Sequence, residues 1–364
     1  MEPTPKLKHS APEPLLTRHL FLDTQVYREL GHNPANPALT ALKQHIDAHR
    51  VVLHTTDITM AEVRRQIRES VLTRARELNA LEKDFRRWRR QAPKSMPGEP
   101  FQFETEAVAA ELYDCFEHFI MIQCGAYLHH AMASDATTVF EKYFDRKPPF
   151  DGTDSKEFPD AFVLEALSGW AESAQDTMYV VTLDRAMGRA ADVDLSLRPI
   201  TSIKDALARA GAALGADAET EAEAILQNPV FDTSLARLLQ AQMPETVFIY
   251  AGDQLAEGVA YEGELVEVEE VSHWTVISLT EMRPVLLLDA RAKFRVEVQF
   301  EDRTAGLYDR EDRRWYGGED ASIGIEDSAE IELFVEINRA SCEVVGCKVL
   351  TNEIGVSDPP DYEY

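Results

Sequence analysis

The sequence lacks long apolar runs, has few cysteines and is short of basic residues. No stretch of its 364 residues approaches the roughly 18 apolar residues that a membrane-spanning helix needs, so no membrane segment is expected. Residues 1–17 are polar and proline-rich, without the apolar core of a signal peptide, and are expected to form a disordered arm. Four cysteines favour a reducing compartment over a disulfide framework. These absences predict a soluble, cytoplasmic protein.

The shortage of basic residues is uneven along the chain. The net charge is −27. Residues 1–200 hold 24 Lys and Arg against 30 Asp and Glu, a balance of −6, whereas residues 201–364 hold 13 against 34, a balance of −21. A chain of this length can form two domains, and such asymmetry is typical of two modules with different roles. The second module is too acidic to be expected to bind nucleic acid.

The first module alternates short apolar runs with segments of helical periodicity. The expected strands are HLFLD (19–23), RVVLHTT (50–56), MYVVTLD (178–184) and, more weakly, LRPI (197–200). The expected helices cover residues 37–48, 61–92 and 161–174. This alternation predicts an α/β fold with a mainly parallel sheet, in which ligands bind beyond the carboxyl ends of the strands.

Four acids are expected at that edge of the sheet. Asp23 and Asp184 end apolar runs. Thr59 and Glu62 have the spacing of a capping box directly after the second strand, and Asp160 follows a proline suited to the first position of a helix. Because the helices begin where the strands end, all four carboxylates should converge on one rim.

Each acid also has an ordinary structural explanation, as a helix cap, a turn residue or a favourable charge at a helix N-terminus. Their shared topological position favours a joint role. Like charges gathered on one rim repel each other unless a cation neutralises them. Ligands that are all oxygens favour a hard cation, so the sequence predicts a Mg²⁺ or Mn²⁺ site.

The motifs FLDTQVY, TMAEVRRQI, KEFPDAFVLEAL and YVVTLDRAM, in this order, resemble those of PIN-domain nucleases over residues 18–204. The resemblance implies a three-layer PIN-like fold and a metal-dependent ribonuclease. It assigns metal binding and catalysis to Asp23, Glu62, Asp160 and Asp184, with Thr24 and Thr182 in support. Gln25 stands where the family often has Asn, and the long segment 64–148 resembles the helical insertion of a subset of members.

A helix without glycine or proline is expected from Glu62 to residue 92. Residues 64–94 hold 11 basic residues against 4 acidic ones, a local balance of +7. The basic residues on one side are Arg65, Arg68, Arg76, Lys83, Arg87 and Arg90. They form either a rail for RNA phosphates or a solvated face balanced by nearby acids. A second helical stretch is expected from Glu104 to about Lys142.

The C-terminal module is expected to contain a connector at 205–230 and an acidic β-rich domain at 231–364. In KFRVEVQF (293–300) and AEIELFVEI (329–337), apolar and polar residues alternate, which predicts an antiparallel sheet or sandwich with one solvated face. We expect this module to bind a protein partner or inhibitor, or to restrain the basic helix in cis. Assembly into a homo-oligomer stays open.

These patterns predict an endoribonuclease that hydrolyses RNA phosphodiester bonds with Mg²⁺ or Mn²⁺, in a toxin-like, defence-related or RNA-processing role. The choice of RNA over DNA comes from the family resemblance alone. The alternative is a non-catalytic RNA-binding or scaffolding protein on the same fold, since fold does not guarantee activity. A haloacid-dehalogenase phosphatase also begins with a strand-terminal Asp, but Gln25 stands where its second Asp is required.

Overall fold

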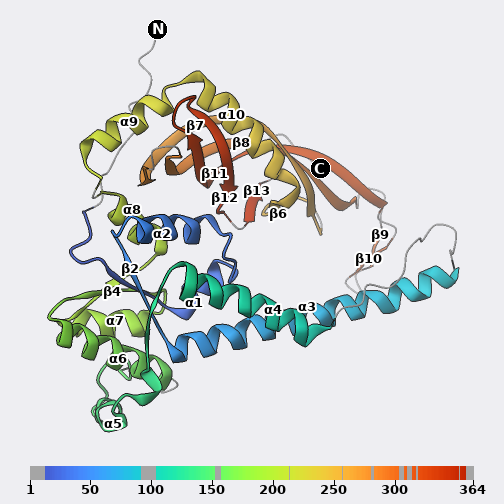
Figure 1. Cartoon of the computed structure of the whole chain (residues 1–364). Helices are drawn as coiled ribbons and strands as arrows, with labels where there is room; N and C mark the ends of the chain where they lie inside the picture. Colours follow the sequence, from blue (N-terminus) through green and yellow to red (C-terminus); the bar gives the residue numbers. More distant parts are fainter. Residues whose placement is uncertain are drawn as a thin grey trace. The chain divides into compact units, whose positions relative to one another are not determined.

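The computed structural model divides the chain into two compact units, Leu15–Ala210 and Gly211–Tyr364 (Figure 1). The residues it describes are 13–91, 104–151, 157–212, 214–255, 257–279, 283–302, 307–309, 314–316, 319–351 and 353–357. At some positions, Lys83 and Arg90 among them, only the backbone is described. Within these residues, no helix is both long and apolar enough to cross a membrane.

A five-stranded parallel sheet organises the first unit, as the sequence predicts. The strand order is β3-β2-β1-β4-β5. The strands are β1 (His19–Leu22), β2 (Val52–Thr56), β3 (Tyr127–His129), β4 (Met178–Val181) and β5 (Leu197–Ile200). The central strands β1 and β4 are almost wholly buried, which explains why each reads as a continuous apolar run.

Helices follow the strands in the order expected of an α/β unit. They are α1 (Thr24–Glu29), α2 (Pro37–Asp47), α3 (Asp57–Gln91), α4 (Thr105–Glu117), α5 (Ala136–Phe144), α6 (Phe158–Ala174), α7 (Arg185–Val193) and α8 (Ile203–Ala212). In one core cluster, Val163 and Leu167 of α6 join Phe21 of β1 and Val180 of β4. Helix α6 is thereby fixed against the middle of the sheet, and its first turn carries Asp160.

The predicted capping box at the start of α3 is wrong. The helix begins at Asp57 rather than Glu62, so Thr59 already lies inside it. The backbone N–H of Thr59 donates to the hydroxyl of Thr56 at 2.9 Å, which makes Thr56 the capping side chain. Glu62 is therefore free of the capping role and points its carboxylate elsewhere.

The single helix expected from Glu104 to Lys142 is also wrong. Helix α4 ends at Glu117 and is followed by a π-helical turn (His118–Gln123). This turn stops before Gly125, whose φ is +60°. The chain then forms β3, a strand inside the segment expected to be a helical insertion, and a short 3₁₀ turn (Ala131–Ala133) precedes α5. The left-handed backbone at Gly125 is incompatible with a continuing helix.

The second unit contains the predicted antiparallel sheet, in the order β12-β11-β8-β7. Its strands are β7 (Val259–Ser278), β8 (Val285–Asp302), β11 (Glu319–Asn338) and β12 (Glu343–Val349). Smaller pairs are β6 (Val247–Tyr250) with β13 (Glu353–Val356), and β9 (Leu307–Asp309) with β10 (Arg314–Tyr316). The inward face of β8 is buried, from Leu286 to Phe300 at alternate positions, as the alternation in the sequence predicts.

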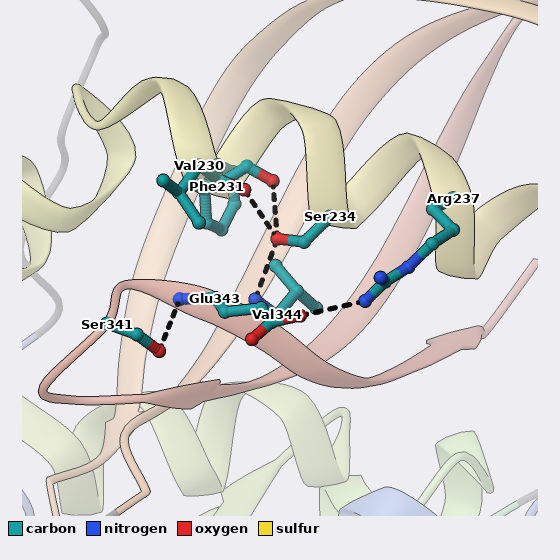
Figure 2. Close-up of polar contacts among 7 residues, drawn as sticks. All are labelled: Val230, Phe231, Ser234, Arg237, Ser341, Glu343 and Val344. Atoms are coloured by element: carbon teal, nitrogen blue, oxygen red, sulfur yellow. Dashed lines mark hydrogen bonds and ion pairs between the residues drawn. The ribbon is translucent and has the colours of Figure 1, made fainter.

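Helices α9 (Ala216–Leu226) and α10 (Pro229–Gln242), followed by a 3₁₀ turn (Met243–Glu245), supply the helical part of this unit. The expected connector 205–230 thus includes α9, and Ala222 and Ile225 lie in the same core cluster as the sheet. Figure 2 shows how α10 meets β12: the buried Ser234 hydroxyl accepts from the N–H of Val344 at 2.8 Å, and Arg237 pairs with Glu343 at 2.9 Å.

Candidate active site

Asp23 lies at the centre of the predicted acidic rim. It follows β1 directly and caps α1, since its carboxylate accepts from the N–H of Thr24 at 2.6 Å. Its other oxygen accepts from the hydroxyl of Thr182 at 2.8 Å. Asp23 is 6% exposed, and burial raises the pKa of its carboxyl, assisted by the negative charges of Glu62 and Asp184 and opposed by the two hydrogen bonds. A buried acid of this kind is costly to keep charged.

Thr24 connects Asp23 to the first turns of α3. Its hydroxyl donates to Oε2 of Glu62 at 2.7 Å, although the two residues come from different helices. Thr24 is buried and Glu62 is half-buried, so the bond is partly shielded from solvent and orients the Glu62 carboxylate. Thr24 thus hydrogen-bonds to two of the four acids, Asp23 through its N–H and Glu62 through its hydroxyl.

Asp184 occupies the corresponding position after β4. Its carboxylate caps α7 by accepting from the N–H groups of Ala186 at 2.6 Å and Met187 at 2.9 Å. Its own N–H donates to the hydroxyl of Thr182 at 3.0 Å. Both strand-terminal acids are thus helix caps and members of the rim at once. The capping function alone leaves carboxylate lone pairs available for a further partner.

Asp160 is close enough to the other three acids to be affected by their charges. It lies in the first turn of α6 and is partly buried. Burial, together with the negative charges of Asp23, Glu62, Asp184 and Glu157, raises the pKa of its carboxyl to about 7. Because each of the other three rim acids acts on Asp160, the sheet edge brings all four predicted site residues into one electrostatic group.

The donor chemistry of the rim fits a hard divalent cation. All four side chains offer carboxylate oxygens, and none of them forms an ion pair with Lys or Arg in the part of the chain that the structure describes. Within that same part, no three His, Cys, Asp or Glu side chains are arranged so that they could hold a metal ion. The carboxylate oxygens are therefore of the kind that Mg²⁺ or Mn²⁺ prefers. The described side chains are not already arranged around a common point as metal ligands.

The basic residues predicted to bind nucleic acid lie along α3, the longest helix of the unit (Figure 1). Two of them are engaged by acids: Arg65 pairs with Glu69 at 3.2 Å, and Arg68 makes a bidentate pair with Glu106 of α4. Arg76 and Arg87 are exposed. The side chains of Lys83 and Arg90 lie outside what the structure describes.

Arg189 is a residue near the rim that the sequence patterns do not single out. It lies on α7 beyond Asp184 and makes a bidentate pair with Asp151, with both contacts at 3.0 Å. This pairing raises the pKa of Arg189, and the charges of Glu157 and Asp184 contribute. Arg189 lies five residues after Asp184, on the helix that Asp184 caps. That spacing was the feature of the sequence that could have identified Arg189 as a neighbour of the rim.

Residues 20–187 match the family model for the PIN domain. The matched range contains all four rim acids and ends inside α7. The region beyond it matches no family model. Neither the curated proteins nor the solved structures include a match to the chain.

Proposed function

We propose that this protein is a metal-dependent endoribonuclease, because residues 20–187 match the model of the PIN-domain family, whose members are generally nucleases. The observation that carries the proposal is the electrostatic grouping of four carboxylates at the carboxyl edge of the sheet. Such a concentration of negative charge is unfavourable at neutral pH, and a bound cation would relieve the repulsion. The non-catalytic alternative would not require all four acids to converge.

Asp23, Asp160 and Asp184, with Glu62, would hold the Mg²⁺ or Mn²⁺. When bound, such an ion lowers the pKa of a water molecule and neutralises charge that develops on the phosphoryl oxygens. Thr182 and Thr24 orient the carboxylates through the bonds at 2.8 and 2.7 Å. This orientation is fixed before substrate arrives, which reduces the reorganisation that the reaction requires.

RNA would run along α3, with Arg76 and Arg87 as its first phosphate contacts. Both are exposed, and their planar guanidinium groups suit bidentate phosphate binding. Arg65 and Arg68 would first have to exchange their carboxylate partners for phosphate. The acidic second unit would serve as the surface for a protein partner or inhibitor.

The test is cleavage of labelled single-stranded RNA by the full chain, with Mg²⁺, Mn²⁺ or EDTA. Metal-dependent cleavage is expected, and it should disappear in the Asp23→Asn/Asp184→Asn variant. Asp135→Asn is the matched control, because Asp135 caps α5 as Asp184 caps α7 and Asn is an equally good cap. Metal-independent cleavage, or full activity in the double variant, contradicts the proposal. If the protein neither cleaves RNA nor binds metal, the non-catalytic alternative is favoured.

A further inference from the structure

Three histidines from adjacent strands form a hydrogen-bonded chain across the sheet of the first unit. Nδ1 of His19 lies 2.8 Å from Nε2 of His54, and Nδ1 of His54 lies 2.8 Å from Nε2 of His129. The indole of Trp170, on α6, contacts all three rings. His54 is 1% exposed and His129 7%, so the chain is largely removed from water.

The protons in this chain have a defined direction. The carboxylate of Asp176 lies 3.5 Å from Nε2 of His19, which favours a proton on that nitrogen. Nδ1 of His19 must then accept, so His54 donates from Nε2. Nδ1 of His54 must accept in turn, and His129 donates from Nε2. Three neutral rings, each protonated on Nε2, therefore satisfy both hydrogen bonds.

The chain can take up one extra proton but not two. If His54 becomes an imidazolium, it donates from both nitrogens, and His129 needs only to move its proton to Nδ1. A second proton produces two imidazolium rings, each of which has two N–H donors and no acceptor. The one neutral ring that is left has a single acceptor nitrogen, so the two ring–ring hydrogen bonds cannot both form. One ring–ring bond must then break, and two buried positive charges repel each other.

The surroundings give little compensation for positive charge. Asp176 faces only the His19 end, where Arg18 opposes it. His130 lies beside His129 and adds a further titratable group, with Asp57 3.7 Å away from its ring. Tyr127 contributes only an aromatic contact. Burial, reinforced by neighbouring histidines, lowers the pKa of His54 to about 3 and that of His129 to about 4.

The chain of histidines ends on β3, an edge strand of the sheet. β3 has three residues and lies at the edge; among the strands that the structure describes, it pairs with β2 alone. Its first residue, Tyr127, is 54% exposed. The buried ring–ring hydrogen bond from His129 therefore adds a side-chain link between this short edge strand and β2.

We propose that His19, His54 and His129 form a pH-sensitive latch, which holds β3 on the sheet while the chain is neutral and releases it when the chain takes up protons. The segment after β3 is linked to the helix that carries the rim acid Glu62. The N–H of Met132 donates to Asp57, the first residue of that helix, α3. Release of β3 would loosen this contact. Loss of activity in acid thus rests on the proposed function, whereas release of the strand does not.

A histidine released into solvent has a pKa of about 6.5, whereas the latched His129 has one of about 4, so protons favour the released strand as the pH falls between these values. The test is amide hydrogen exchange on the full chain between pH 6.5 and 4.5, with protection factors corrected for intrinsic rates. Protection of the β3 amides (127–129) should fall by about ten-fold or more, while Val180 in the central strand β4 changes little. In the His129→Gln variant, the glutamine amide can still donate to His54 but cannot take up a proton. The loss of amide protection in β3 should therefore occur at lower pH than in the unaltered protein. The matched control is His118→Gln, at an exposed histidine outside the chain.

Simultaneous loss of protection in β3 and β4, or an unchanged pH dependence in His129→Gln, overturns the proposal. If His129→Gln does not fold, ¹⁵N resonances of the imidazole rings in the unaltered protein decide. All three rings should carry the proton on Nε2 at pH 7, and a proton on Nδ1 of His19 or His54 overturns the proposal. Because exchange and ring resonances do not depend on nuclease activity, failure of the latch is distinguishable from failure of the proposed function.

Discussion

Thr182 donates a hydrogen bond of 2.8 Å to Asp23, although 159 positions separate the two residues in the sequence. The bond joins the ends of the neighbouring parallel strands β1 and β4. The same hydroxyl accepts from the N–H of Asp184 at 3.0 Å. One threonine side chain, 3% exposed, therefore ties together the two acids that end these strands.

Replacement of this threonine by its near-isostere in Thr182→Val should weaken metal binding. The Asp23 carboxylate would lose the bond that opposes its raised pKa, and its orientation would no longer be fixed. We expect Mn²⁺ affinity, measured by calorimetry, to fall by about ten-fold or more. Thr137→Val removes an exposed hydroxyl and should leave the affinity unchanged. Equal affinity in both variants would show that Thr182 does not position the site.

The central strands were predictable from sequence because burial on both faces demands continuous apolar runs, as in β1 and β4. The strand β3 was not predictable, since an edge strand of three residues has no such run and pairs with β2, where Tyr127 lies opposite His54. The start of α3 was misplaced because Thr56 and Thr59 both satisfy the local requirements of a cap, and only tertiary packing selects between them.

The positions of the rim acids followed from topology, since strand ends and helix starts share one edge of a parallel sheet. Their individual partners did not. The bond between Thr24 and Glu62 depends on how α1 meets α3, and the pair of Arg189 with Asp151 joins segments with no shared pattern. In the second unit, alternation predicted the sheet but not its strand order, which depends on long-range pairing.

Asp160→Asn should stabilise the first unit at alkaline pH when divalent cations are absent. The folded-state pKa of about 7 lies above the ordinary value of 3.8, so this group's contribution to stability is fully present below pH 3.8 and is lost as the pH rises to 7. The neutral amide avoids that loss. We expect the free energy of unfolding in EDTA to increase by about 2–4 kcal/mol at pH 8 and to change little at pH 4.

Thermal or urea unfolding at both pH values measures this difference. Asp114→Asn, at an exposed position on α4, removes the same charge and should change stability by less than about 0.5 kcal/mol. A destabilised Asp160→Asn protein at pH 8 would mean that the other acids do not act on this carboxyl. Added Mn²⁺ should stabilise the unaltered protein more than the variant.

Arg76→Glu/Arg87→Glu should weaken RNA binding and reduce its dependence on salt. Each lost phosphate contact lowers the slope of log affinity against log salt by about 0.7 for single-stranded RNA. Titrations of labelled RNA at several salt concentrations measure this slope. Arg198→Glu makes the same charge change at an exposed site on β5 and should reproduce only the general effect of net charge. Equal losses in both proteins would exclude a specific rail on α3.

Gly263→Ala should destabilise the second unit, because a Cβ at this position would lie 2.3 Å from the ring of Phe248. Phe248 is 5% exposed and belongs to the core cluster, so its ring cannot move without disturbing other packing. Overpacking of this kind costs about 1–3 kcal/mol. Gly324→Ala is the matched control on β11, where the nearest atom to the new Cβ is 3.9 Å away. Because alanine restricts the unfolded chain more than glycine does, this control should be neutral or slightly stabilising in urea unfolding. Equal stability of the two variants would mean that the contact between β6 and β7 is not close-packed.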